Sequence, residues 1–600
     1  MAKTKRTPAR EAIRTEHKWD LTPLYENDQA WKKAFLELEK RIPEFEKFRG
    51  KLGKSAAALR KCLEFEVEFD KEGERLGNYA FLRYSEDVRD HDALAMVSRF
   101  THLSTRANEA ASFIAPEIQA IPKKTMERFM KSPELADFRF TLEKLLRYRP
   151  HILSEAEERI LAMQGEVAGT ADKIFEQLTD ADMDFGYVTN EKGEEVQLTQ
   201  SSIGSLYESR KRSVRKEAFK TFYGEFDAHK NTLAASLGSS VLQDIYQARV
   251  RNYPSALEAS LFADNVPVSV YDNLIRTVRR NLDAVYHYLS VRQRALKLKD
   301  LHIYDCYVPI VKLGEIKTPY EKAASQIVEA LAPLGEEYCR TLAHGLTNRW
   351  VDRFENKGKR SGAFSAGGYV GPPYILMNYK DDTMSSVFTL AHEAGHSMHT
   401  YYSAATQPYQ YYNYTIFVAE VASTFNEQLL NNYLLERAPD KKTRAFLICR
   451  EIDEIRGTLI RQTMFAEYEK IIHAIAESGA PLTLQELQEE YYKLLETYFG
   501  PDFALDPELS LEGLRIPHFY RAFYVYKYAT GLSAAIALAD RVMKGGPKAR
   551  DQYLDFLRGG GSKFPLDLLR DAGVDMEKPK PVNTAMARFK RLVEELDELV

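Results

Sequence analysis

Cysteine and long apolar runs are scarce in this chain. Its 600 residues include four widely separated cysteines with no C-x-x-C pair: Cys62, Cys306, Cys339 and Cys449. This usage argues against a disulfide framework and is typical of a reduced compartment, so we expect a cytoplasmic protein. No apolar run reaches the ~18 residues of a membrane-spanning helix, and the basic start lacks the apolar stretch of a signal peptide. We therefore expect no membrane partner, and a mobile tail from Lys3 to Arg10.

The chain also lacks a strong excess of one charge. It has 83 basic and 87 acidic side chains, for a formal net charge of −4. Because nucleic-acid binding depends on basic surfaces, we expect no nucleic-acid partner. The length exceeds that of one ordinary domain, which indicates several domains or one large helical body with lobes. No feature of the sequence indicates the oligomeric state.

Helical patterns dominate the chain. From Asp28 to about Asp180 the sequence predicts long amphipathic helices with few breakers. Two short alternating segments around Asn190–Gly193 predict a β-hairpin, and helices resume after it. The predicted fold is therefore mainly α, with an N-terminal helical lobe in residues 1–200 that ends in the hairpin and a second domain in residues 201–600.

The most informative pattern is His392-Glu393-Ala394-Gly395-His396, an H-E-x-x-H sequence. On a helix, residues i and i+4 lie about 40° apart around the axis, so both imidazoles can reach one metal ion. Neutral imidazoles suit Zn²⁺, and a catalytic zinc site has three protein ligands and a position for water. Glu393 then stands beside the ion as the general base for that water. The pattern predicts a hydrolase with one Zn²⁺ per chain; the alternative is a pair of core histidines.

The flanking residues predict that this motif is helical. Asp382 and Thr383 offer N-cap oxygens ahead of a proline-free run from Met384 to Tyr402. Gly395 lowers helix propensity by about 1 kcal/mol relative to alanine, which is typical of a position where something approaches closely. Apolar side chains cluster on the face opposite the histidines, where we expect packing: Val387, Leu390, Ala391, Ala394 and Met398.

A third metal ligand must come from elsewhere. His399 shares the helical face of His392 but lies about 10 Å further along the axis, too far for one ion to hold both with His396. We expect it to support the ligands from beside them or to face the substrate or, equally, to be a core histidine. Glu420 is the better ligand, because it shares a helical face with Glu427 in a mostly apolar stretch, where a carboxylate needs a cation. Glu427 is expected to orient a ligating imidazole through its free N–H.

These segments together resemble a known family. HEAGHSMHTYYS, followed by FVAEVASTFNE with Glu420 twenty-four residues after His396, is similar to the thimet oligopeptidase family of zinc peptidases, and most of all to its oligoendopeptidase F branch. Trp19–Tyr25 (WDLTPLY) and Arg515–Tyr520 (RIPHFY) extend the resemblance over nearly the whole chain. It implies a two-lobed helical body with a deep internal groove, and a zinc endopeptidase that hydrolyses short, unstructured oligopeptides.

Hydroxyl and imidazole groups are dense near the carboxyl end, where eleven residues contain His518, Tyr520, Tyr524, Tyr526 and Tyr528. Peptide hydrolysis needs donors aimed at the oxygen that becomes negative. Tyr524 and Tyr528 have i, i+4 spacing and face the same way on a helix, with Tyr520 in the same row. Such rows also occur as core packing. The family resemblance favours catalysis, since its members carry a His and Tyr pair here that binds the substrate carbonyl. It implies that role for His518 with Tyr524 or Tyr528.

A segment rich in glycine and proline, Gly362 to Asn378, precedes the H-E-x-x-H motif. Together with residues from about Leu301 to Leu313 it is expected to form a small sheet. Its prolines restrict the short strand to a sheet edge, and its glycines permit close backbone approach. Such an edge can bind a peptide as an added strand near Gly367, Gly368 and Tyr369; the alternative is a plain surface loop. The resemblance agrees with peptide binding, because family members bind substrate beside the zinc helix.

Two other functions stay open. A zinc carboxypeptidase or dipeptidyl carboxypeptidase on a similar helical scaffold needs a cation for the substrate's terminal carboxylate, and Arg515 and Arg521 flank His518. A catalytically silent peptide-binding protein is the other alternative. The presence of both Glu393 and Glu420 argues against it, because a site without activity is free to lose its base.

Overall fold

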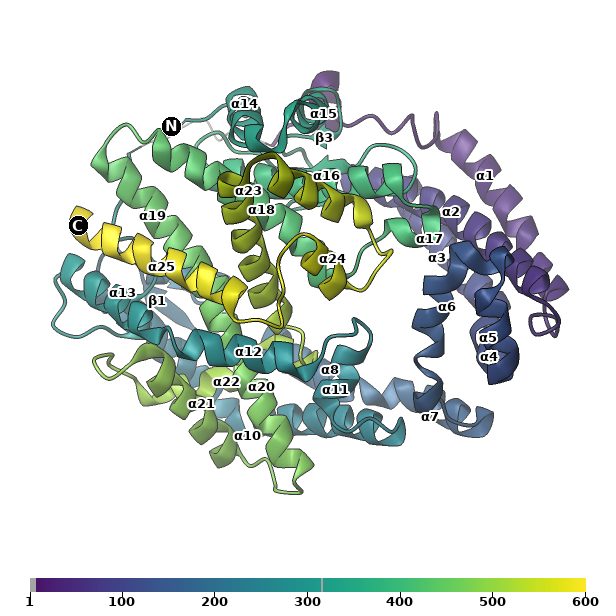
Figure 1. Ribbon diagram of the computed structural model, residues 1–600. Helices are drawn as coiled ribbons and strands as arrows, with labels where there is room; N and C mark the ends of the chain where they lie inside the picture. Colours follow the sequence, from purple (N-terminus) through teal and green to yellow (C-terminus); the bar gives the residue numbers. More distant parts are fainter. Residues whose placement is uncertain (1–6, 315–316) are drawn as a thin grey trace. The chain divides into compact units, whose positions relative to one another are not determined.

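The protein is mainly helical, as its computed structural model shows for residues 7–314 and 317–600 (Figure 1). The chain forms two compact units, each assembled from three segments. Unit 1 comprises Met1–Pro150, Glu315–Tyr433 and Leu538–Gly573, and unit 2 comprises His151–Gly314, Leu434–Ala537 and Val574–Val600. The expected boundary near residue 200 falls inside unit 2, so the compact units do not follow it. A division at that point remains a prediction about sequence domains.

Unit 1 contains helices from three parts of the chain. They are α1 (Asp28–Arg41), α2 (Ala56–Glu86), α3 (His91–Ala111), α4 (Ile114–Ala120), α5 (Lys123–Lys131), α6 (Arg139–Leu146), α14 (Tyr320–Ala330), α15 (Glu336–Thr347), α16 (Met384–Thr406), α17 (Tyr409–Tyr412) and α24 (Pro565–Asp571). Two helices contribute residues to both units: α18 (Ile416–Glu436) and α23 (Tyr526–Gly559).

The remaining helices belong to unit 2. They are α7 (Glu155–Ala168), α8 (Thr170–Gln177), α9 (Ile203–Tyr207), α10 (Arg212–Val250), α11 (Ala256–Phe262), α12 (Val268–Arg279), α13 (Leu282–Ala295), α19 (Lys441–Ile455), α20 (Arg461–Glu477), α21 (Leu484–Phe499), α22 (Glu512–Arg515) and α25 (Lys580–Leu599). Short 3₁₀ segments include η7 (Ile303–Asp305), η10 (Pro507–Leu511) and η11 (Pro517–Tyr520), and η6 (Leu178–Asp182) and η9 (Arg456–Ile460) are π-helical turns.

The predicted hairpin is confirmed. Strands β1 (Tyr187–Thr189) and β2 (Glu195–Gln197) pair in antiparallel fashion in unit 2. The turn is closed by the Asn190 side chain, which accepts hydrogen bonds from the N–H groups of Lys192 and Glu194. An asparagine that bonds its own following backbone is a usual turn device, which is why the sequence signal was clear.

A three-stranded sheet in unit 1 lies against α16, but its composition differs from the prediction. Its strands are β3 (Val351–Asp352), β4 (Phe364–Ala366) and β5 (Tyr374–Leu376), in the order β3-β5-β4. β3 is parallel and β4 antiparallel to β5, and both β4 and β5 contact α16. Residues 301–313 contain no strand and carry η7 instead. The third strand was missed because two residues show no alternation that a sequence pattern can reveal.

The start of the described chain is anchored. The Arg10 guanidinium donates to both carboxylate oxygens of the buried Asp352, at 3.0 and 2.6 Å, and lies 2.9 Å from Glu86. The Lys359 side chain is also buried, and its Nζ lies 2.6 Å from the same Asp352 carboxylate. The expectation of a mobile tail is therefore wrong for Arg10, because a buried acid requires its cations; residues 3–6 of that tail lie outside the described residues.

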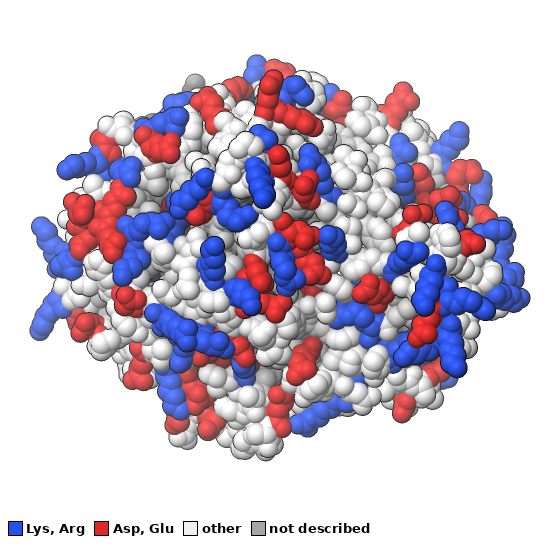
Figure 2. Space-filling model, in the orientation of Figure 1, with Lys and Arg blue, Asp and Glu red and all other residues white. Residues whose placement is uncertain are grey.

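Acidic and basic side chains are interspersed over the face seen in Figure 2. Within residues 7–314 and 317–600, no helix combines the length and the apolar character of a membrane span.

Helices α16 and α18 approach each other at backbone distance. A Cβ atom at Gly395 would lie 2.5 Å from the Ala422 carbonyl oxygen and 2.6 Å from the Ser423 Cα. The Asn426 side chain donates a hydrogen bond of 3.2 Å to the Ala391 carbonyl across the same contact. Only glycine permits this approach, so Gly395 sets how closely the Glu420 face of α18 meets the histidine face of α16.

We predict that Gly395→Ala destabilises the protein and reduces its metal content. An alanine in a helix normally adds about 1 kcal/mol of stability relative to glycine, but overpacking against the backbone of α18 costs typically 1–3 kcal/mol and displaces Glu420. Thermal unfolding and metal analysis measure both effects. The matched control is Gly224→Ala in α10, where nothing lies within 4 Å of the added carbon and stability is expected to hold or rise. Equal behaviour of the two variants contradicts the close-contact explanation.

Candidate metal centre

The predicted metal ligands converge. Helix α16 begins after the N-cap Thr383, whose side chain accepts from the Ser385 N–H at 3.2 Å. It projects His392 and His396 from one face, while its predicted apolar face is buried. The Glu420 Oε2 lies 3.3 Å from the His392 Nε2 and 3.5 Å from the His396 Nε2.

These distances fit a tetrahedral zinc ion. Ligands about 2.0–2.1 Å from such an ion are separated by roughly 3.4 Å, close to the spacing observed here. His392, His396 and Glu420 form a group whose ligand atoms all lie within 4.8 Å of one another, and the described part of the chain contains no second group of this kind. Two nitrogens and one carboxylate oxygen are also the donor set of many catalytic zinc sites, so the residues fit Zn²⁺.

Glu427 occupies the position expected of an orienting group. Its Oε1 lies 2.7 Å from the His392 Nδ1. Glu427 follows Glu420 in α18 by about two helical turns. A hydrogen bond from Nδ1–H to Glu427 leaves the Nε2 of the same ring as the free acceptor that faces Glu420. Ser423, between the two acids, donates a 3.0 Å hydrogen bond to the Glu420 Oε2. The three residues share one face of α18, as their spacing predicts.

Attraction between imidazoles and carboxylates dominates the electrostatics. Burial lowers the pKa of His392, but its hydrogen bonds with Glu420 and Glu427 raise that pKa to about 10. Burial raises the pKa of Glu420, yet hydrogen bonds with His392 and His396 hold it well below its usual range. The same concentration of lone pairs and negative charge attracts a divalent cation.

Glu393 lies beside the ligands and is only 8% exposed. Its burial raises the pKa of the carboxyl group, an effect that the two imidazoles and a backbone hydrogen bond from Ser365 only partly offset. Ser365 belongs to strand β4, and its hydroxyl is 2.8 Å from the Ser397 hydroxyl on α16. No sequence pattern marks Ser365, because its contacts arise only when β4 packs on α16.

Among the described residues, no hydrogen bond or ring contact joins His399 to His392, His396 or Glu420. His399 is buried, and its ring stacks on Tyr414 with centroids 3.6 Å apart and planes at 4°. Burial, with a smaller contribution from His396, lowers its pKa to about 3. Of the expectations for His399, the core histidine is the one that agrees with this position.

The glycine-rich segment packs on the protein itself. A Cβ at Gly367 would lie 2.5 Å from the Thr400 side chain, and one at Gly368 would lie 2.3 Å from the Asn78 side chain. The Tyr369 N–H donates to the Glu74 carboxylate at 2.8 Å. These three residues are therefore used for packing against α16 and α2. The neighbouring β4 is an edge strand, since it pairs only with β5 among the described residues.

A second cluster of polar groups lies in unit 2, at the start of α23. The His518 and Tyr524 ring centroids are 6.2 Å apart, those of His518 and Tyr528 are 6.1 Å apart, and the two tyrosines are separated by 5.4 Å. Among the described residues, no hydrogen bond engages the His518 imidazole or the Tyr524 hydroxyl. Burial and the charge of Arg521 lower the pKa of His518. The His518 imidazole and the Tyr524 hydroxyl therefore remain available to donate to a ligand.

The other residues of this stretch have different roles. Tyr520 belongs to η11, and its ring stacks on that of Phe175 with centroids 4.5 Å apart. Because α23 begins only at Tyr526, Tyr520 and Tyr524 do not share a helix, and Tyr520 does not continue the predicted row. Tyr526 is fully buried. Arg515 donates 3.0 and 3.2 Å hydrogen bonds to the Glu512 carboxylate and the Tyr223 hydroxyl.

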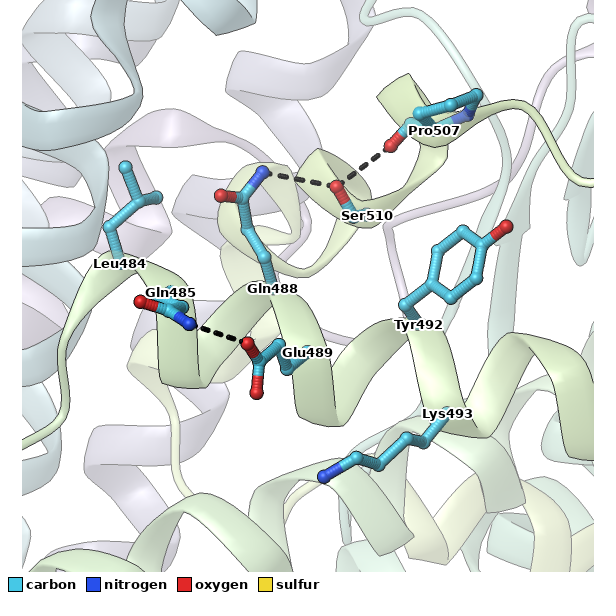
Figure 3. A pocket seen from close by; sticks show the side chains of 8 residues that line it. All are labelled: Leu484, Gln485, Gln488, Glu489, Tyr492, Lys493, Pro507 and Ser510. Atoms are coloured by element: carbon cyan, nitrogen blue, oxygen red, sulfur yellow. Dashed lines mark hydrogen bonds between the residues drawn. The ribbon is translucent and has the colours of Figure 1, made fainter.

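Figure 3 shows a different hollow of unit 2, about 500 Å³ in volume, between α21 and η10. Its wall groups bond to one another: Gln485 donates to Glu489 at 2.7 Å, and Gln488 donates to the Ser510 hydroxyl at 3.0 Å. It contains none of the predicted site residues, so we do not assign it to the site.

Comparison with known proteins gives consistent matches. Residues 205–588 match peptidase family M3, and residues 117–185 match a family described as oligopeptidase F. Oligopeptidase PepF of Bacillus subtilis is 42% identical over 100% of this chain and 89% of its own length. An oligoendopeptidase F homolog of Borreliella burgdorferi is 39% identical over 98% and 99% of the two chains. The crystal structure of oligoendopeptidase-F from Enterococcus faecium superposes with a TM-score of 0.73 at 34% identity, over 95% and 99% of the chains.

We predict that Glu427→Ala weakens metal binding about 10- to 100-fold while the three ligands stay in place, because the His392 ring loses the acceptor that orients it. Competition with a chelator of known affinity measures the change. Glu427→Gln keeps an acceptor and should lose less. Glu436→Ala, at the exposed end of the same helix, is the control and should bind metal normally. Unchanged affinity in Glu427→Ala removes the orienting role.

Proposed function

Because this chain belongs to peptidase family M3 and is a metalloendopeptidase, we propose that it uses Zn²⁺ to hydrolyse internal bonds of short, unstructured oligopeptides. One observation carries the zinc assignment: His392, His396 and Glu420 converge at tetrahedral spacing beside the buried Glu393. The described residues contain no second group of three potential metal ligands at such distances.

His392, His396 and Glu420 would hold the Zn²⁺, which when bound would supply a Lewis acid for the scissile carbonyl and make a neighbouring water more acidic. Glu393 then accepts a proton from the attacking water on its carboxylate and delivers it to the nitrogen of the departing amine. The burial of Glu393 supports this role, because a carboxylate with little solvent is a stronger base than an exposed one.

His518, with Tyr524 or Tyr528, is proposed to donate hydrogen bonds to the oxygen that becomes negative in the tetrahedral intermediate. The free imidazole of His518 and the free hydroxyl of Tyr524 support this assignment.

The edge of β4 is proposed to bind the peptide backbone as an added strand. The backbone of Ser365 in this strand also contacts Glu393, which would bring a bound peptide beside the base. Recognition through main-chain hydrogen bonds accepts many side chains and requires an extended substrate, which favours unstructured peptides. We also propose that the deep groove implied by the family resemblance limits the length of the substrate.

We also propose that the enzyme works in the cytoplasm. Its four cysteines are free thiols, as is typical of a protein in a reducing compartment.

The carboxypeptidase alternative now depends on Arg521. Arg515 is committed to Glu512 and Tyr223, whereas Arg521 is exposed and forms no ion pair with any described residue. A terminal carboxylate would need such a free cation.

A peptide of about ten residues, internally quenched and amidated at its carboxyl end, tests the proposed function. We expect the zinc-loaded enzyme to cleave the blocked and the free peptide at the same internal bond with similar kcat/KM, as mass spectrometry of the products shows. Folded protein substrates should resist cleavage. An exopeptidase would leave the blocked peptide intact, and its activity on the free peptide would fall in Arg521→Ala.

Glu393→Gln should retain zinc and thermal stability but lose about 10²- to 10⁴-fold in kcat, because an amide cannot accept the proton of the water. Metal analysis and unfolding measurements on the same preparation exclude a trivial loss of the site. Turnover close to that of the wild type would assign the base to another residue.

A further inference from the structure

Phe523 has a backbone conformation that aromatic residues rarely adopt. Its φ angle is +58°, in the left-handed region. The other described non-glycine residues with positive φ are Asn252, Asn265, Lys297 and Arg349, all of which have polar side chains and are at least partly exposed. Phe523 is fully buried. A bulky residue in this region costs free energy, so the surrounding structure must hold it there.

Two side chains hold the peptide group that precedes Phe523. The Ser260 hydroxyl of α11 donates 3.2 Å to the Ala522 carbonyl, and the Phe523 N–H donates 2.9 Å to the Glu469 Oε1 of α20. This C=O and N–H belong to one planar trans peptide and point in opposite directions. The plane is therefore clamped from both sides, and its orientation determines φ at Phe523.

The side chain of Phe523 is held as firmly as its backbone. The centroid of its ring lies 4.5 Å from that of the His473 ring and 6.0 Å from that of the Tyr271 ring. Val525, two residues later, is also fully buried. Tyr271 is itself fixed by a 2.6 Å hydrogen bond from its hydroxyl to the Ala466 carbonyl. The turn thus cannot relax by moving the ring alone.

The residue after this clamped turn is Tyr524. The left-handed turn directs the chain so that the Tyr524 ring faces His518 and Tyr528. We propose that Glu469, assisted by Ser260, is a positioning residue that holds Phe523 in its left-handed conformation and thereby keeps the Tyr524 hydroxyl aimed for catalysis. This inference rests on the proposed donor role of Tyr524.

Glu469 is suited to this task as a neutral group. It is fully buried, its Oε2 has no hydrogen-bond partner among the described residues, and no cation is bonded to it. Burial, together with the charge of Asp244, raises its pKa far above the usual range of a glutamate, although the Phe523 N–H acts in the opposite direction. A neutral carboxyl accepts from Phe523 through its carbonyl oxygen, so glutamine is its close mimic and methionine is a mimic of size without an acceptor.

The experiment compares Glu469→Gln with Glu469→Met, each made in the wild type and in Tyr524→Phe, with zinc-loaded full-length enzyme and the blocked peptide. Tyr524→Phe alone should lower kcat by about a hundredfold to a thousandfold. Made in the wild type, Glu469→Met should lower kcat about tenfold with KM and zinc content little changed. Glu469→Gln should retain most of the wild-type kcat, because it keeps the acceptor for the Phe523 N–H. In the Tyr524→Phe background, Glu469→Met should cost less than about twofold more, because the group that it positions is already absent.

Additive losses in the double variant, or equal losses in Gln and Met, overturn the positioning role while leaving the role of Tyr524 intact. Wild-type kcat in Tyr524→Phe overturns the donor role itself, and this inference with it. The two failures are therefore distinguishable.

A readout without turnover completes the test. Amide hydrogen exchange around Phe523 should accelerate in Glu469→Met and not in Glu469→Gln, since only methionine leaves the N–H without its acceptor. If Glu469→Met does not fold, Ser260→Ala against Ser260→Thr provides the same comparison at the other side of the peptide group. Unchanged exchange and unchanged kcat in Ser260→Ala then contradict the clamp.

Discussion

The contact between the backbones of α16 and α18 at Gly395 is the constraint on which the metal centre depends. Glutamates on α18 reach the imidazoles on α16 only because no side chain separates the helices there. Each helix then contributes what its own periodicity provides: His392 and His396 from one, Glu420 and Glu427 from the other. A site of this kind needs no loop to close it, so its geometry is as rigid as the packing of the two helices.

The same arrangement decides how the charges of the site are used. Glu420 and Glu427 face imidazoles, whereas Glu393 faces the backbone of β4 and is shielded from solvent. The three glutamates of this cluster therefore do not share one environment. This separation is consistent with the proposed division of roles, in which Glu420 ligates the metal, Glu427 orients a ring and Glu393 acts as base, because the surroundings of a carboxylate determine its affinity for a proton or a metal ion.

Unit 2 builds its polar cluster by a different physical means. There η11 carries His518, and the short turn between η11 and α23 carries Tyr524. A turn is intrinsically less rigid than a helix. Buried groups compensate for this: a hydroxyl and a carboxyl hold one peptide plane, and two rings hold the side chain of Phe523. Strain at Phe523 is sustained by the surrounding core, which is how functional sites commonly keep an unfavourable conformation.

Local patterns in the sequence were sufficient to predict the mainly helical class, the hairpin at Asn190, the helix that carries His392 and His396, and the shared face of Glu420 and Glu427, because each depends on periodicity or turn chemistry within one element. The tertiary structure decided the rest. It made His399 a core residue, turned Gly367 and Gly368 towards the protein's own helices, separated Tyr520 from Tyr524, and recruited Val351–Asp352 into the sheet. It also assembled each compact unit from three separate segments. The physical reason is the same in every case: periodicity shows which face of an element is buried, but only long-range packing determines what covers that face.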